Sequence, residues 1–535
     1  MTKHRLSLAT LAVAALLGAA CSPVGQDGGG GTEDPRTGQA RKGGDLVVAL
    51  SEEPDRLDPS LARTFVGRIV FSSICEKLYD VDENLEVVPQ LAADLPDVSD
   101  DGLTVRIPVR EGITFNDGTN FDAEAVKRSL DRHREISGSA RASEIAPIEE
   151  VRVVDDTTVE IGLSEPFAPL TAALADRAGM IMSPAQLDKL GENFADEPVC
   201  VGPFSFAERK AQDRIVVTKS EHYYDAGKVN LDRVVYRTIA EPNVRLSNLR
   251  SGDIHVAEDV APTDVATIQN DANFQVVETT SIGYQGITVN IGNGDGVGPP
   301  FTKPGTPLAS EEKLREAFEL SLDRDALNKI VFDGRHTPGC TPLSPASPWA
   351  VEGFECTPHD VEAAKRLVRE SGIPTPIPVE LITANNAEEV RVGEVIQSMA
   401  KEAGFAVTVR PTEFAAALDE AEAGNFDTFR IGWSGRIDAD QNVHQFQHSS
   451  GSLNWAGTND ADIDRLLDEA RAAQSTEERK ELYRQAVERA SEVRGIIYLY
   501  HENLFLGAAQ EIVGLEYFGD GLIRVTNAGF AAEQG

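Results

Sequence analysis

A regular alternation of strand and helix patterns between residues 310 and 497 constrains the fold of this chain most strongly. Three apolar runs have strand character: VELIT (379–383), FAVTVRP (405–411) and FDTFRIGW (426–433). Amphipathic segments that stop near Gly372, Gly404 and Gly424 separate them. Glycine is common just past a helix end, because it adopts the left-handed backbone conformation needed there. Strands that alternate with helices predict an α/β domain.

The first half of the chain has shorter strand patterns. LTVRIPVR (103–110) and TTVEIGL (157–163) alternate apolar and polar residues, and DRIVVTK and LDRVVYRTI are further strand candidates. Helices are predicted to begin at Asp122 and Asp323, and Ser475 with Glu478 forms a capping box. A chain of 535 residues is long enough for about three domains.

The N-terminus has the pattern of an export signal. Lys3 and Arg5 precede an uncharged apolar run that ends at Ala20 and is too short to span a membrane. LLGAAC resembles a bacterial lipobox, in which Cys21 carries the lipid; Gly18 fits less well than the usual leucine, so plain secretion is the alternative. We expect a signal peptide over 1–20, a flexible tether over 21–42, and an exported protein held by lipid at the outer face of the cell membrane.

Charge and cysteine content restrict the partners and the compartment. The formal net charge of -37 argues against nucleic acid as a partner. Besides Cys21 the chain has Cys75, Cys200, Cys340 and Cys356, and an even number in an exported chain indicates two disulfides. Cys340 and Cys356 flank a proline-rich loop. No CxxC pair is present, so a zinc site is not predicted.

Five stretches resemble, in chain order, the extracellular solute-binding proteins of peptide, nickel and related ABC importers. They are ICEKLYDVDENLEVVPQLAAD, SDDGLTVRIPVREGITFNDGTNFDAEAVKRSL, VGPFSF, LREAFELSLDRDALNKIVFDG, and YRQAVERASEV with IIYLYHENLF. The resemblance implies an α/β, periplasmic-binding-protein-like fold of two lobes with a hinge, a ligand between the lobes and an extra inserted domain.

The same resemblance implies how the chain is divided. A composite domain is expected from 43–78, 200–284 and 498–535, an inserted domain from 79–199, and the second lobe from 285–497. Cys75 and Cys200 then lie where the chain leaves and re-enters the composite domain, which is a reason to pair them.

The function implied is capture of a peptide, or of a peptide-like or acidic small solute, and its delivery to an ABC permease. We expect a monomer without cofactor or catalytic activity. The alternatives are a metal-chelate receptor of the nickel type, a secreted hydrolase, and a signalling or adhesion protein. HExxH and GxSxG motifs are absent, and no GK follows the glycine-rich GNGDGVG (292–298). His444 and His448 have the spacing of a metal pair, but no third ligand is evident, so surface histidines are the simpler interpretation.

The stretch GWSGRIDAD (432–440) follows a strand that the resemblance places at the cleft. Oligopeptide-binding relatives have an aspartate two residues after the position of Ser434, and it binds the amine of the peptide. Here the residue is Arg436, which cannot accept a hydrogen bond but binds carboxylates through two parallel bonds. We expect Arg436 to bind an acidic group of the ligand; the alternative is an ion pair with Asp438 or Asp440.

Other residues join this prediction with alternatives of their own. Arg430 is a second candidate for an acidic group, or else forms a structural salt bridge. Trp433 stacks on the ligand or belongs to the core. The resemblance implies that LARTFVGR (61–68) faces the ligand from the other lobe. The predicted ligand-binding residues are Thr64, Phe65, Val66, Arg430, Trp433, Ser434, Arg436, Asp438 and Asp440.

Overall fold

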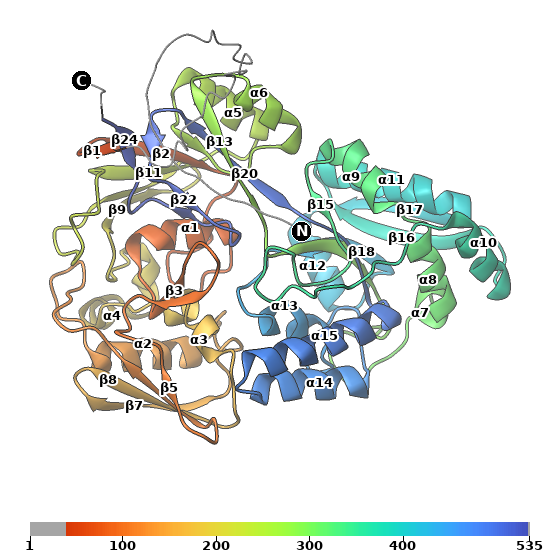
Figure 1. Ribbon diagram of the computed structural model, residues 1–535, viewed down its shortest axis with the longest axis horizontal. Coiled ribbons are helices and arrows are strands. Elements are labelled where there is room, and N and C mark those ends of the chain that lie inside the picture. Colours follow the sequence, from red (N-terminus) through yellow and green to blue (C-terminus); the bar gives the residue numbers. More distant parts are fainter. Residues whose placement is uncertain (1–38, 533–535) are drawn as a thin grey trace, which may run out of the picture.

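Two mixed β-sheets, one in each lobe, organise the computed structural model, which describes residues 39–532 (Figure 1). The predicted signal peptide, Cys21 and most of the predicted tether lie outside this range. Within it, no helix combines the length and the apolar character that crossing a membrane requires.

Seven strands form the sheet of the first lobe. The short central strand β2 is parallel to both of its neighbours, and the other pairs are antiparallel. Three of its six side chains lie completely out of solvent, which explains its apolar sequence DLVVAL. In sheet order the strands are β13 (Phe274–Thr280), β20 (Asn503–Ala509), β12 (Val256–Ala257), β2 (Asp45–Leu50), β11 (Arg233–Thr238), β10 (Arg214–Lys219) and β9 (Phe204–Lys210). The associated helices are α1 (Phe65–Ile74), α5 (Pro242–Ser251) and α6 (Val265–Gln269).

A smaller antiparallel sheet is inserted into this lobe. Helix α2 (Ala123–Glu135) covers it and begins at Asp122 as predicted, because the Asp122 carboxylate accepts a hydrogen bond from Ala125 N. Residues between Leu78 and Val201 form a separate apolar core here. The strands, in sheet order, are β5 (Asp97–Val98), β6 (Thr104–Pro108), β8 (Thr158–Leu163) and β7 (Ile148–Asp155). Two more helices follow β8 in the chain, α3 (Leu170–Ala173) and α4 (Pro184–Leu190).

The second lobe has the predicted alternation of strands and helices. Asp323 and Ser475 start helices as predicted, and Gly404 ends one with a φ of 105°. In sheet order its strands are β15 (Thr337–Pro338), β19 (Ile496–His501), β14 (Tyr284–Val289), β18 (Thr428–Trp433), β16 (Ile377–Ala384) and β17 (Phe405–Thr412). Its helices are α7 (Pro307–Ser310), α8 (Glu312–Leu320), α9 (Arg324–Phe332), α10 (Val361–Glu370), α11 (Ala387–Ala403), α12 (Phe414–Glu422), α13 (Asp440–Gln447), α14 (Ala461–Ala472) and α15 (Thr476–Val493).

Short pairings complete the structure. A three-stranded sheet joins β1 (Ala40–Arg41), β24 (Gly529–Ala531) and β21 (Ile512–Val513). Two hairpins are formed by β3 (Tyr79–Val81) with β4 (Val87–Pro89) and by β22 (Glu516–Tyr517) with β23 (Ile523–Arg524).

The described chain crosses between the lobes twice. β13 continues into β14 through 281–283, and β19 continues into β20 through Glu502. Ser281 N donates to the Glu502 carbonyl at 2.8 Å, so the two crossings lie side by side. Because β19 stays in the sheet of the second lobe as far as His501, the second crossing is at Glu502 and not between residues 497 and 498 as expected.

The two predicted disulfides are present. Cys75 at the end of α1 joins Cys200, and Cys340 joins Cys356, with Cα–Cα distances of 4.9 and 5.6 Å. The first bond links positions 125 residues apart and the second links positions 16 apart. A cross-link that closes a longer loop removes more entropy from the unfolded chain.

We therefore expect loss of the long-range disulfide to destabilise the protein more. The chain-entropy relation gives about 4.7 kcal/mol for a loop of about 100 residues and about 3 kcal/mol for about 15 residues. The Cys75→Ala/Cys200→Ala variant should unfold at lower denaturant concentration than the matched Cys340→Ala/Cys356→Ala variant, and both below wild type. Equal midpoints for all three proteins, or free thiols at these positions in non-reducing peptide maps, would contradict the pairing.

Candidate functional site

The loop after β18 lies directly against the crossing between the lobes. Gly435 has a φ of 80°, and a Cβ atom there would lie 2.5 Å from the carbonyl carbon of Ile282. Only glycine combines this backbone conformation with so close an approach. The sequence GWSGRIDAD therefore leads out of the sheet at the point where the two lobes meet.

Arg436 reaches from this loop to the inserted domain. Its side chain is only 10% exposed, and Nε lies 3.4 Å from Asp176 Oδ2. Asp176 also accepts a hydrogen bond of 3.2 Å from Arg68 Nε of α1. The guanidinium of Arg436 lies 4.4 Å from the ring centre of Trp433 and donates to Gly435 O. The acidic partner of Arg436 is thus Asp176, and neither Asp438 nor Asp440.

Positive charge is in excess around Asp176. Burial raises the pKa of the Asp176 carboxyl, but the surrounding arginines hold that pKa well below its usual range. Burial and neighbouring arginines lower the pKa of Arg177 to about 9 and that of Arg436 to about 10. The group contains four arginines and two carboxylates, namely Arg68, Arg141, Arg177, Arg436, Asp176 and Glu144.

Several guanidinium nitrogens of this group have no hydrogen-bond partner among residues 39–532. They are Arg68 Nη1, Arg141 Nε and Arg177 Nε. A buried cation with unused donors is costly unless an anion can approach it. The group has the chemistry of an anion-binding site.

Asp438 and Asp440 hold the loop to helices α14 and α15. Asp438 forms two hydrogen bonds with Arg479 of α15, at 2.7 and 2.9 Å. Asp440 does the same with Arg471 of α14, at 2.7 and 2.9 Å. Both aspartates are buried, and these ion pairs engage both oxygens of each carboxylate.

The other predicted residues of β18 and of the loop after it differ in exposure. Arg430 is buried and bonded to Gln285 (2.6 Å), Glu389 (3.2 Å) and Tyr500 (2.5 Å), which matches the structural alternative. Trp433 is half-buried, with Nε1 donating to Asn442. Ser434 is exposed, and its hydroxyl accepts from Arg436 Nη1 at 3.2 Å.

The three residues predicted on the first lobe also differ. Thr64 precedes α1 without a capping hydrogen bond from its side chain, and its hydroxyl donates to Asp55. Val66 is 1% exposed and belongs to the apolar core, so its side chain does not face the cleft. Phe65 is half-buried, and the guanidinium of Arg68 lies 5.8 Å from its ring centre. Of the three, only the Phe65 side chain lines a cavity between the lobes.

That cavity, called here the interlobe cavity, has a volume of about 580 Å³. Phe65, Glu258 and the residues around them line it from the first lobe, and His336 with Asn386–Glu388 lines it from the second. Glu502 and Asn503 of the second crossing complete the wall. Ligand cavities commonly measure about 300–1,000 Å³. Sequence reasoning identified only Phe65 here, because the remaining residues come from segments with no shared motif.

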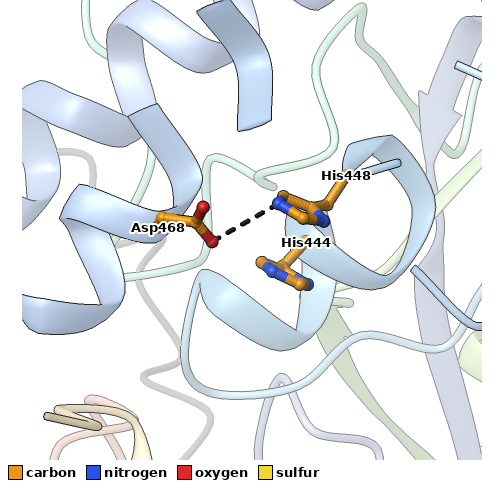
Figure 2. Close-up of side chains that lie close together, drawn as sticks. All are labelled: His444, His448 and Asp468. Carbon is orange, nitrogen blue, oxygen red and sulfur yellow. Dashed lines mark ion pairs between the residues drawn. The ribbon is translucent and has the colours of Figure 1, made fainter. Parts of the chain in front are cut away.

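The histidine pair has a third neighbour that the sequence did not reveal. Figure 2 shows His444 and His448 beside Asp468, whose Oδ1 lies 3.3 Å from His448 Nε2. Ser450 N donates to His448 Nδ1 at 3.0 Å, so the neutral ring carries its proton on Nε2. A metal would need the lone pair of that nitrogen. The hydrogen bonding therefore favours an interaction between His448 and Asp468 over metal ligation.

Comparison with known proteins agrees with this architecture. The chain is 27% identical over 460 residues to the glutathione-binding protein GsiB of Escherichia coli O157:H7, covering 85% of this chain and 81% of GsiB. The ABC transporter substrate-binding protein CtaP of Listeria monocytogenes superposes with a TM-score of 0.81 at 20% identity, covering 92% of this chain and 100% of CtaP. DppA of Helicobacter pylori, in complex with the peptide STSA, gives 0.79 at 22% identity, covering 92% and 99%.

These two structural likenesses support the two-lobed α/β fold with an extra domain. The family of bacterial extracellular solute-binding proteins, family 5 Middle, matches residues 86–454. The chain belongs to the family 5 bacterial extracellular solute-binding proteins.

Proposed function

We propose that this protein is the lipid-anchored receptor of an ABC importer and captures a peptide or peptide-like small solute outside the cell. The observation that carries the proposal is the interlobe cavity, which is lined by residues of both lobes and by Glu502 of the second crossing, in a chain of this family. Solute enclosed there would be delivered to a membrane permease. The relatives are transport proteins.

The proposed domain division follows the sheets, with a composite domain, an inserted domain and a second lobe. Closure would rotate the second lobe about 281–283 and Glu502, since only these two segments connect the lobes in the described chain. A solute that contacts both lobes favours the closed form by its differential affinity. Solute identified by mass spectrometry of the natively purified protein should reduce the radius of gyration in X-ray scattering when it is added back.

Arg436 is proposed to contribute an anion-binding group to the cleft. The surplus of arginines around Asp176 supports this role, because an acidic group of the solute would balance that surplus. The competing interpretation is that Arg436 only bridges the lobes through Asp176. The two interpretations predict different effects on solute affinity when the Asp176 carboxylate is removed.

The first expectation here concerns Arg436→Ala. Loss of a charge-assisted hydrogen bond worth about 1.5–3 kcal/mol should weaken binding of the co-purified solute roughly 10- to 100-fold. Asp176→Asn should leave affinity unchanged or raise it, because the Asp176 carboxylate then no longer competes with the acidic group of the solute for Arg436. The measurement is calorimetric titration of that solute into each variant.

The matched control is Arg494→Ala, which removes an arginine of the second lobe that pairs with Glu319. It should leave affinity unchanged. If Arg436→Ala and Asp176→Asn weaken binding equally, and the double variant is no worse than either, the pair acts only as a bridge between the lobes.

The second expectation concerns the anchor. Cys21, which lies outside the described residues, is proposed to carry the lipid. Cys21→Ser should therefore release the protein from the membrane fraction with its solute affinity unchanged, because Cys21 precedes the first strand of the described fold, β1 (Ala40–Arg41), which already lies at the end of the predicted tether. Fractionation and N-terminal peptide mapping check this. A soluble wild-type protein that begins at another residue would refute lipid anchoring.

A further inference from the structure

We propose that the interlobe cavity binds a positively charged organic group of the solute, an ammonium or a guanidinium. This inference rests on the proposed function and specifies the class of solute. It differs from the expectation raised by Arg436, which concerns an acidic group at the other side of Phe65. A solute that binds both the arginine group and the interlobe cavity carries an acidic group and a positively charged group.

The composition of the cavity wall is the first argument. Among the described residues that line it, six are carboxylates and none is lysine or arginine. The acids come from both lobes and from the crossing, so a cation between them would draw the lobes together. They are Glu241, Glu258, Asp259, Asp264, Glu388 and Glu502.

Unused acceptor capacity is the second argument. Glu258 is only 6% exposed, and its Oε2 accepts from Ser51 N at 2.8 Å. Its other oxygen makes no hydrogen bond with residues 39–532. Glu502 likewise uses one oxygen, which accepts from Gln285 Nε2 at 2.8 Å. A buried carboxylate with a free oxygen in a cavity is satisfied by a donor brought by a ligand.

The spacing of the acids favours an organic cation over a metal ion. Within residues 39–532, the only three side chains of suitable type whose ligand atoms lie within 4.8 Å of one another are His444, His448 and Asp468, outside this cavity. The cavity acids therefore do not converge on one point, and about 580 Å³ is far more space than one ion fills. Phe65, Phe505 and Tyr517 in the wall suit the apolar stem of a longer cation.

Two of the cavity acids have pKa values near neutral pH. Burial raises the pKa of Glu258 to about 7, with Asp259 adding to the rise and Arg245 opposing it. Burial also raises the pKa of Glu502 to about 7; Arg430 opposes this rise, and the carboxylates Asp259, Glu389 and Glu388 add to it. A cation that enters the cavity should displace protons and should bind more tightly as pH rises from 6 to 8.

The test uses pairs of probes that differ in charge but little in shape. N-acetylglycyl-arginine is compared with N-acetylglycyl-citrulline, and N-acetylglycyl-lysine with N-acetylglycyl-norleucine, by calorimetric titration of the full exported protein at pH 8; acetylation removes the N-terminal ammonium, so only the side chain differs in charge within each pair. The cationic member of at least one pair should bind about ten-fold or more tightly than its neutral partner. Equal affinity within both pairs would overturn the proposal, and so would tight binding of Ni²⁺ or Ca²⁺ that excludes the peptides.

Two isosteric variants test whether Glu258 and Glu502 bind the cationic probe. Glu258→Gln and Glu502→Gln should each weaken the cationic probe about ten-fold and leave the neutral probe unchanged. The control Glu420→Gln removes a carboxylate that pairs with Arg410 outside the cavity and should change neither. The same variants are titrated with the solute that co-purifies, so the result does not depend on the choice of dipeptide.

Thermal unfolding of the empty protein gives an independent readout. A carboxyl whose folded pKa is about 7 holds a proton that the unfolded chain releases above about pH 4.5, so its contribution to stability falls as pH rises from 4.5 to 7. Glu258→Gln should therefore raise the melting temperature relative to wild type at pH 8 more than at pH 5. An equal change at both pH values would mean that Glu258 serves only to fix Ser51.

Failure of this inference can be distinguished from failure of the proposed function. If the co-purified solute is bound and closes the lobes but is unaffected by both glutamine variants, the cavity assignment is wrong and the receptor function stands. If no solute is bound and none closes the lobes, the receptor function itself is wrong.

Discussion

The hydrogen bond from Ser281 N to the Glu502 carbonyl marks the constraint on which the rest of the structure depends. It joins the two crossings, and each crossing is a strand that leaves one sheet and enters the other. Because both strands are fixed in sheets on either side, the freedom between the lobes is confined to the few residues at the junction. The loop with Arg436 and the interlobe cavity both lie against this junction.

Charge is distributed unequally around the junction. On one side, four arginines surround two carboxylates, and on the other the described cavity wall contains six carboxylates without a lysine or arginine. Phe65 contacts both regions, since Arg68 lies 5.8 Å from its ring and the ring lines the cavity. Opposite charges on the two sides of one aromatic ring suit a solute with separated charges.

Much of the fold could be predicted from the sequence because its signals are local. Asp122, Asp323 and Ser475 cap helices through bonds to backbone groups three residues away, and such bonds leave a visible pattern. The loop GWSGRIDAD was likewise located after a strand. The directions of its charged side chains were not predictable, because Arg471 and Arg479, which bind the two aspartates, lie more than 30 residues farther along the chain.

The sequence by itself determined the α/β character of the second lobe, the helix starts and the family resemblance. The cysteine count indicated two disulfides, and the resemblance gave a reason for the pairing of Cys75 with Cys200. Only the tertiary structure decided that Arg436 meets Asp176 and that Glu258 and Glu502 share a cavity. Helix caps and strand periods depend on neighbours within a few residues. The charge of a cavity depends on distances in space between segments that no sequence pattern connects.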